Sequence, residues 1–513
     1  MPPSSRGQGT RRPRMGSGAS QGVAAAVSVA SAEDLRASLG SLPHEVRSKL
    51  HAALSEREVC LRIPDHLATG GRLQLSPLDI TTIGRATPMV WFYAETLDAD
   101  KLLSALEKTL VSYPVLCGRY DGSSPPAAVE LSNAGVPVDV CVARAPGLSA
   151  TEASGHVPGA AARTTPSSFA RDIHEPFVPA KEGMDPDAGS PEAPLLKIRI
   201  TLFPAGGTAI GMLAQHGIVD AEAQIAFFTN WSRAFRGLEP EPAPLHDRTR
   251  ICQLSTGALA KGEKPAGFKV RTVPPGGKVV PEFAGVLPKL GGGQVVAVPL
   301  PAARLKELTA AARAELPEGQ HVSADDVLTA HVWKAMVRMR CQQLGLSVES
   351  EETTTCSRAF NVRRRTEPPL GPGYFANGAT QIFTELTVAQ LCAMGPSAVA
   401  QRLRGSINEH KPETTAARIQ WLRAQQEQGC RVSGVYDQHA LTFIISSWMF
   451  DWEGVDFNAR PTGFDHGALT PIVAVFTPRP RGDGVNVYTS GSTDSTAHFA
   501  ELLTQTASSG QSG

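Results

Sequence analysis

Two residues four positions apart, His216 and Asp220, have the types and the spacing for acid–base chemistry. An imidazole with an ordinary pKa of about 6.5 can accept a proton near neutral pH. A nearby carboxylate can fix the local geometry around such a base. The same H-x-x-x-D spacing occurs again at His321 and Asp325, so spacing alone does not identify the functional histidine.

The elements that must position the two histidines differ. Residues 208–214 are typical of a buried strand and residues 221–235 of a helix, so His216 is expected to project from a strand end into a cleft. His321 instead lies just before Ser323, a typical N-cap residue, and helix capping explains the polar residues there. Context therefore favours His216, and the rest of the chain must decide its role.

Strands and helices interleave through the whole chain, which predicts an α/β class with mixed sheets. Residues 241–293 are rich in Pro, Gly and Lys and have little periodicity. They are predicted to link an N-terminal lobe, residues 33–240, to a C-terminal lobe, residues 294–505. Residues 1–32 and 506–513 are predicted to be disordered.

The composition excludes several classes of protein. The 49 basic residues balance the 49 acidic residues, which argues against nucleic acid as a partner. No apolar run approaches the roughly 18 residues of a membrane helix. The eight cysteines form no C-x-x-C pair, which argues against a zinc site and against a disulfide framework.

The cysteine usage favours a reducing compartment, and we predict a cytoplasmic protein. Residues 1–32 carry four arginines and no acidic residue. That composition also fits a transit peptide, which would direct the protein to a plastid or another organelle.

Seven segments between about residues 73 and 505 follow a recognisable order. They comprise residues 75–79 with 87–93, 110–119, 215–221, 244–248, 322–334, 361–377 and 446–448. Together they resemble the signatures of the plant-type BAHD acyl-CoA-dependent acyltransferases, and of the hydroxycinnamoyltransferases among them. This family shares its fold with chloramphenicol acetyltransferase and with the condensation domains of peptide synthetases.

The resemblance implies a fold of two similar-sized domains like chloramphenicol acetyltransferase, with the active site in a channel between them. It also implies transfer of an acyl group from an acyl-CoA co-substrate to a hydroxyl or amine of a small molecule. His216 would be the general base, and transfer would pass directly through a tetrahedral intermediate. We expect a monomer, with no metal and no permanently bound cofactor.

Other site residues follow from the positions that match the family. Asp220 is expected to pair with Arg363 and to support the loop that carries His216. Trp448 and Thr87 are expected to donate hydrogen bonds to the acyl oxygen or to the intermediate. The substrate channel is expected to include Gly217, Tyr374, Asn377 and Phe450.

One signature departs from the family. The usual D-F-G-W-G is replaced by a segment that keeps Asp456 and Phe457 but has lost both glycines and the tryptophan. The change raises the alternative of a catalytically weak or inactive relative that only binds or regulates. A third alternative, a condensation-type unit that uses carrier-bound acyl groups, is disfavoured because Gln215 stands where a second histidine would be.

The acceptor is expected to lack a carboxylate. Hydroxycinnamoyltransferases of this family commonly carry an arginine two residues after the tryptophan of the T-S-W strand, and this chain has Phe450 there. We therefore predict a neutral alcohol, phenol or amine. The sequence does not specify the acyl donor.

Overall fold

The computed structural model describes residues 56–143, 147–155, 165–166, 177–179, 190–254, 263–275, 287–290, 294–434, 440–466 and 470–504. The predicted N-terminal extension, residues 1–32, and the predicted tail, residues 506–513, lie outside the described residues. Part of the predicted linker, residues 241–293, also lies outside them.

The first large sheet has six strands in the order β1-β6-β8-β9-β3-β16. Every residue of β9 is buried, and so is nearly every residue of β3, which explains their almost continuous apolar sequences. The strands are β1 (Arg57–Leu61), β6 (Val136–Val142), β8 (Leu196–Leu202), β9 (Thr208–Gln215), β3 (Ala86–Tyr93) and β16 (Gly463–His466).

The second large sheet has seven strands in the order β13-β12-β15-β17-β18-β11-β7. Parallel and antiparallel neighbours occur together, because β12, β15 and β17 run parallel while the others pair antiparallel. The strands are β13 (Ala379–Thr387), β12 (Thr353–Asn361), β15 (Thr442–Ser447), β17 (Val473–Pro478), β18 (Gly484–Gly491), β11 (Gln294–Pro301) and β7 (Thr165–Pro166).

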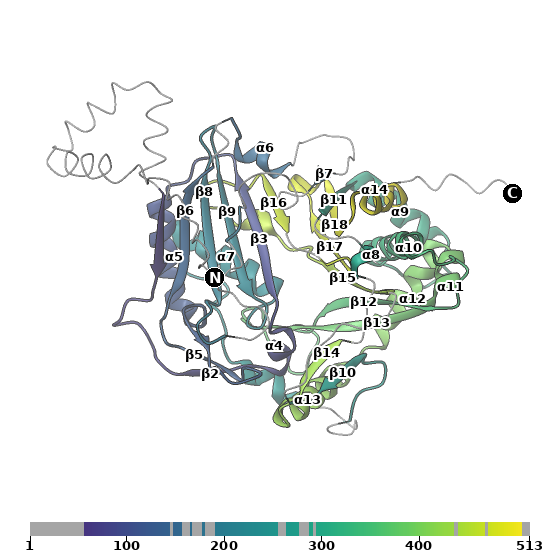
Figure 1. Ribbon diagram of the computed structural model, residues 1–513, viewed down its shortest axis with the longest axis horizontal. Coiled ribbons are helices and arrows are strands. Elements are labelled where there is room, and N and C mark those ends of the chain that lie inside the picture. Colours follow the sequence, from purple (N-terminus) through teal and green to yellow (C-terminus); the bar gives the residue numbers. More distant parts are fainter. Residues whose placement is uncertain are drawn as a thin grey trace, which may run out of the picture. The chain divides into compact units, whose positions relative to one another are not determined.

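Each large sheet contains a strand from a distant part of the chain. Strand β16 comes from the C-terminal part and pairs with β3 at the edge of the first sheet, where Figure 1 shows it in yellow beside the purple β3. Strand β7 pairs with β11 in the second sheet. The site-bearing sheet is therefore completed by residues far along the chain.

Two long helices confirm the sequence expectations at their starts. Helix α7 (Ala221–Phe235) is capped by Asp220, whose side chain accepts from the Ala223 amide. Helix α10 (Ala324–Leu344) is capped by Ser323 in a reciprocal capping box. The mixed α/β class predicted from the sequence is confirmed.

The remaining elements complete the layers around these sheets. The other helices are α4 (Pro77–Thr82), α5 (Ala99–Ser112), η1 (Pro114–Cys117), α6 (Ala150–Ser154), η2 (Arg248–Gln253), α8 (Leu287–Leu290), α9 (Ala302–Ala314), α11 (Val388–Ala393), α12 (Pro396–Glu409), α13 (Pro412–Glu427), η4 (Trp452–Gly454), η5 (Pro480–Gly482) and α14 (Thr493–Thr504). Two small sheets comprise β2 (Arg72–Gln74), β5 (Ala128–Glu130) and β4 (Arg119–Tyr120), and β10 (Val270–Val273) with β14 (Arg431–Gly434).

The hydrophobic core beneath the first sheet is rich in aromatic side chains. Trp91 of β3 stacks on Phe228 of α7 with ring centroids 4.1 Å apart, and Phe464 of β16 meets Trp91 edge-on at 5.0 Å. Stacked and edge-to-face rings stabilise packing beyond the area they bury. This core makes the sheet a rigid support for the loop that follows β9.

Candidate active site

His216 directly follows β9 and extends its ladder by one hydrogen bond. Its backbone N–H donates to the Arg85 carbonyl over 2.8 Å, across from the start of β3. The next residue, Gly217, has no room for a side chain, because a Cβ atom would collide with the Tyr120 hydroxyl and with Ile83. Glycine at this position therefore lets the backbone pass close to Tyr120 and Ile83 immediately after the histidine.

The carbonyl of His216 is held by two side chains. It accepts hydrogen bonds from Nδ2 of Asn377, at 2.7 Å, and from Oγ1 of Thr82, at 2.9 Å. Asn377 is itself fixed, because its backbone N–H and its Nδ2 both donate to Oδ1 of Asp79 at 2.9 Å. Asp79 also forms a 2.8 Å ion pair with Arg248. A connected buried network of this kind restricts the histidine loop to one conformation.

Asp220 and Arg363 form a bidentate ion pair. Nη1 and Nη2 of Arg363 each lie 2.8 Å from a different carboxylate oxygen of Asp220. The carboxylate also accepts from the amides of Ala223 and Gly378. Burial alone would raise the pKa of Asp220, but the Arg363 guanidinium and these amides lower it, so the carboxylate stays ionised.

Arg363 also ties this pair to the segment that carries Asn377. Its Nε donates to the Tyr374 carbonyl at 3.2 Å, and its Nη2 donates to the Ala376 carbonyl at 2.8 Å. The guanidinium is only 2% exposed, so these bonds are made away from solvent. The ion pair thus joins the start of α7 to the loop before β13.

The imidazole of His216 is partly exposed, and its Nδ1 is buried with no hydrogen-bond partner among the described residues. Burial lowers the pKa of this imidazole, and Arg85 lowers it further. Its own carbonyl, Asp220 and Asn377 act in the opposite direction. The net lowering keeps the ring neutral at neutral pH, which is the form that can accept a proton.

Thr87 and Trp448 reach the same region from different sheets. Thr87 lies on β3 opposite Ala214 of β9 and is buried. Trp448 follows β15, and its indole N–H donates to Oγ of Ser446 at 3.0 Å. The indole N–H of Trp448 is therefore engaged by a residue of the strand that it follows.

The residues expected to line the channel are mostly buried. Asn377, Tyr374 and Gly217 are enclosed, and the hydroxyl of Tyr374 has no hydrogen-bond partner in the described part of the chain. Phe450 is partly buried and packs against the core of the first sheet. Asn377 thus meets the histidine loop directly, whereas Phe450 is given its place only by packing against the core cluster that includes Trp448.

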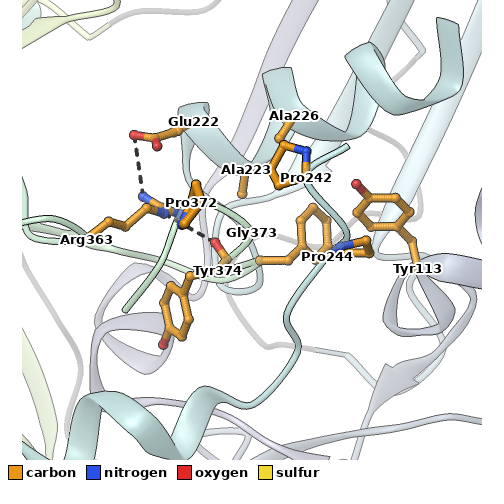
Figure 2. A pocket seen from close by; sticks show the side chains of 11 residues that line it. Tyr113, Glu222, Ala223, Ala226, Pro242, Pro244, Arg363, Pro372, Gly373 and Tyr374 are labelled. Atoms are coloured by element: carbon orange, nitrogen blue, oxygen red, sulfur yellow. Dashed lines mark hydrogen bonds and ion pairs between the residues drawn. The ribbon is translucent and has the colours of Figure 1, made fainter. Parts of the chain in front are cut away.

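Figure 2 shows a pocket in which Arg363 lies between Glu222 and the Tyr374 carbonyl. Nη1 of Arg363 lies 3.9 Å from the Glu222 carboxylate. The other lining residues are Tyr113, Ala223, Ala226, Pro242, Pro244, Pro372, Gly373 and Phe375. His216 is not one of them, so this pocket lies at the arginine side of the ion pair and not at the imidazole.

The altered signature around Asp456 and Phe457 remains anchored. Phe457 is buried and packs edge-on against Trp231 and Tyr93, with centroid distances of 5.2 and 5.8 Å. The next residue, Asn458, has φ +62, a left-handed conformation that asparagine tolerates better than most other residues. Asparagine therefore fulfils the backbone requirement at a position where the family has glycine.

Sequence reasoning missed one titratable residue near the site, His466. It ends β16, is 5% exposed, and its ring lies perpendicular to Trp448 with centroids 4.3 Å apart. No sequence motif includes it, and a four-residue strand has too little alternation to be recognised. Only the pairing of β16 with β3 brings it to the site.

A model of the Transferase family matches residues 61–490, most of the chain. The chain belongs to the BAHD acyltransferase family. It is accordingly an acyl-CoA-dependent acyltransferase, with the acyl-CoA thioester as co-substrate.

Curated relatives include hydroxycinnamoyltransferases. A hydroxycinnamoyl-CoA:5-hydroxyanthranilate N-hydroxycinnamoyltransferase of Avena sativa is 26% identical over 402 residues, covering 74% of this chain and 82% of the relative. A shikimate O-hydroxycinnamoyltransferase of Nicotiana tabacum is 26% identical over 443 residues, covering 80% and 90%. Both N-acylating and O-acylating enzymes are thus similar to this BAHD protein.

Solved structures share the fold at low identity. Vinorine synthase matches with a TM-score of 0.61 and 18% identity over 87% of this chain and 96% of the other. F. graminearum TRI101, complexed with coenzyme A and deoxynivalenol, matches with a TM-score of 0.64 and 17% identity over 83% and 96%.

The described residues contain neither a membrane-spanning helix nor a cluster of metal ligands. None of their helices combines the length and the apolar character needed to cross a membrane. In the same residues, no group of three or more His, Cys, Asp or Glu side chains could hold a metal ion.

Proposed function

We propose that this BAHD protein transfers a hydroxycinnamoyl or benzoyl group from CoA to a hydroxyl or amine of a small acceptor without a carboxylate, with His216 as the general base. The observation that carries the proposal is the half-buried, neutral imidazole of His216 on a loop held by Asn377 and Thr82. A fixed neutral base beside an activated thioester is sufficient for direct transfer.

The reaction requires no covalent enzyme intermediate. His216 takes the proton of the acceptor as the acceptor oxygen or nitrogen attacks the thioester carbon. The carbonyl oxygen becomes an oxyanion in the tetrahedral intermediate, and hydrogen-bond donors there lower the barrier. The carbon–sulfur bond then breaks, the CoA thiolate leaves, and the imidazolium returns the proton to the sulfur.

Asp220 and Arg363 act in this proposal as positioning residues. Their bidentate pair joins the start of α7 to the segment ending at Asn377, which holds the His216 carbonyl. The carboxylate is already saturated by the guanidinium and by two amides. It supports the loop and takes no proton from the substrate.

The apolar Phe450 supports an acceptor without a carboxylate, because an acidic acceptor would gain from a cation at this point. The donor assignment draws on relatives named as hydroxycinnamoyl- and benzoyltransferases. A tryptamine benzoyltransferase of Oryza sativa also supports an amine as the acceptor.

The test incubates the full-length protein with coumaroyl-, benzoyl-, acetyl- and malonyl-CoA and with tryptamine, aromatic alcohols, 5-hydroxyanthranilate and shikimate. Products are identified by mass spectrometry, beside His216→Ala. An ester or amide made by the wild type and lost in the variant supports the proposal. Equal activity in both proteins contradicts the assignment of His216.

Two other results would change the proposal. Acyl-CoA binding in calorimetry with no product from any acceptor would favour a binding or regulatory relative, as the altered segment after Asp456 suggests. Rapid turnover of shikimate alone would contradict the inference from Phe450.

We also propose that the protein acts as a cytoplasmic monomer with two lobes, residues 33–240 and 294–505. The residues assigned to the reaction all come from one chain, so no second copy is needed. Light scattering tests the monomer, and comparison of the full chain with a form lacking residues 1–32 in cells tests the compartment.

A further inference from the structure

His466 lies on the same face of the first sheet as His216 and Thr87. In the pairing of β16 with β3, His466 stands opposite Met89, and in the pairing of β3 with β9, Thr87 stands opposite Ala214. Side chains alternate between the two faces of a sheet, so residues 466, 89, 87, 214 and 216 share one face. Thr87 is the diagonal neighbour of His466 on β3, and such neighbours lie about 7–8 Å apart, close enough for both side chains to contact one small bound group.

The packing around the shared face agrees with this register. Phe464, two residues before His466, contacts Trp91, two residues beyond Met89. Val90 and Phe92, which alternate with these residues, belong to a separate cluster on the opposite face. The side chain of His466 therefore lies on the same side of the sheet as the side chains of Thr87 and Met89.

His466 has hydrogen-bonding capacity that the described protein does not use. Its Nδ1 is buried without a partner among the described residues. A buried polar atom without a partner is costly, and at a functional position it indicates a ligand that completes it. Trp448, in contrast, has committed its indole N–H to Ser446 and offers only its ring to His466.

The two histidines have different protonation requirements. Burial and the nearby His216 lower the pKa of His466 to about 3, so this ring is neutral at neutral pH. A neutral imidazole carries one N–H donor and one acceptor nitrogen. A ring that stays neutral can donate a hydrogen bond to a developing oxyanion without competing with His216 for the acceptor's proton.

We propose that His466 is a further catalytic residue, whose ring N–H donates to the acyl oxygen as the tetrahedral intermediate forms, together with the hydroxyl of Thr87. The inference rests on the proposed function, because the oxyanion arises only in acyl transfer. His466 moves no proton: His216 takes the acceptor proton, and the carbon–sulfur bond breaks as described above. Trp448 then serves to hold the His466 ring by edge-to-face packing.

The test compares His466→Phe, which keeps a ring against Trp448 but has no donor, with His466→Gln, which has an amide donor but no ring. Loss of one oxyanion donor lowers kcat by about 10²–10³-fold in other acyl transfer enzymes. We expect His466→Phe to lose kcat by about 100-fold with the KM for acyl-CoA nearly unchanged. We expect His466→Gln to retain at least tenfold more kcat than His466→Phe.

Thermal unfolding of both variants separates donation from packing. Wild-type kcat in a folded His466→Phe overturns the proposal, and so does an equal loss of kcat in both folded variants. If His466→Phe does not fold, His466→Gln decides alone, and a 100-fold loss of kcat in its folded form overturns the proposal.

The variants also distinguish this inference from the proposed function. An inactive His216→Ala beside a fully active His466→Phe leaves the function standing and removes only the role of His466. An active His216→Ala removes His216 as the base.

Discussion

The two stretches with the H-x-x-x-D spacing are built alike at their aspartates and differently at their histidines. Asp220 and Asp325 both lie at the start of a helix, and each pairs with a buried arginine, Arg363 or Arg358. His216, however, continues a buried strand, whereas His321 is exposed.

In both stretches the H-x-x-x-D spacing therefore marks the start of a helix and an ion pair. Only the stretch that begins with His216 also forms part of the candidate active site. The carbonyl of His216 accepts from Asn377 and Thr82 in a buried network. In the described part of the chain, no side chain donates to the carbonyl of His321. Close by, Asp326, beside Asp325, completes a capping box with Ser323.

The largest expected difference between the two stretches is in turnover. His216→Ala should lower kcat by about 10²–10⁴-fold, the range for loss of a general base. His321→Ala should leave kcat unchanged, because the ring faces solvent. Product formation measured by mass spectrometry for both variants checks this, and an equal effect of the two substitutions would break the comparison.

The second largest difference is expected in the free energy of unfolding when each aspartate is replaced. Asp220→Ala leaves the buried Arg363 without its carboxylate, which should lower the free energy of unfolding by about 3–5 kcal/mol. Asp325→Ala should cost about 1 kcal/mol or less, because its carboxylate is partly exposed and Arg358 keeps Asp326. Urea unfolding of both variants provides the measurement, and similar losses would show that the two pairs are equivalent.

Removal of one amide tests whether the network positions the base. Asn377→Ala removes the bonds to Asp79 and to the His216 carbonyl, which should cost about 1.5–3 kcal/mol and reduce kcat more than it changes KM. The matched change in the second stretch is Ser323→Ala at the N-cap of α10. It should lower the free energy of unfolding by about 1 kcal/mol and leave kcat unaltered. Unchanged kcat in Asn377→Ala would show that the loop holds its position without this side chain.

The smallest expected effect is a shift in pH dependence. Since burial lowers the pKa of His216, more acid is needed to protonate it, and kcat/KM should fall only as the pH drops through a midpoint below 6.5. The profile of His321→Ala should coincide with that of the wild type. A midpoint above 6.5 would mean that a carboxylate, and not burial, dominates the environment of the base.

Local signals in the sequence predicted much of the fold. The bounds expected for residues 221–235 match α7, because the Asp220 cap and the apolar periodicity both lie within one short stretch. Helix α10 runs to Leu344, and the left-handed Gly345 terminates it. A glycine directly after a helical run is the local signal for such an end.

Features that depend on distant partners could not be predicted in this way. Strand β12 begins with three threonines, and the hydroxyl of the buried Thr354 finds its acceptor, the Leu441 carbonyl, far along the chain. His466 became part of the site only through the pairing of β16 with β3.

Strand β16 also has a consequence for protein synthesis. Because β16 and Trp448 lie beyond residue 440, a chain still emerging from the ribosome carries His216 and Thr87 long before it can complete their surroundings. Until then, the edge of β3 lacks its neighbour, and an unpaired edge strand is a template for unwanted association. The late pairing of β16 thus covers an aggregation-prone edge in the same step that completes the sheet on which Thr87 lies and from which His216 follows.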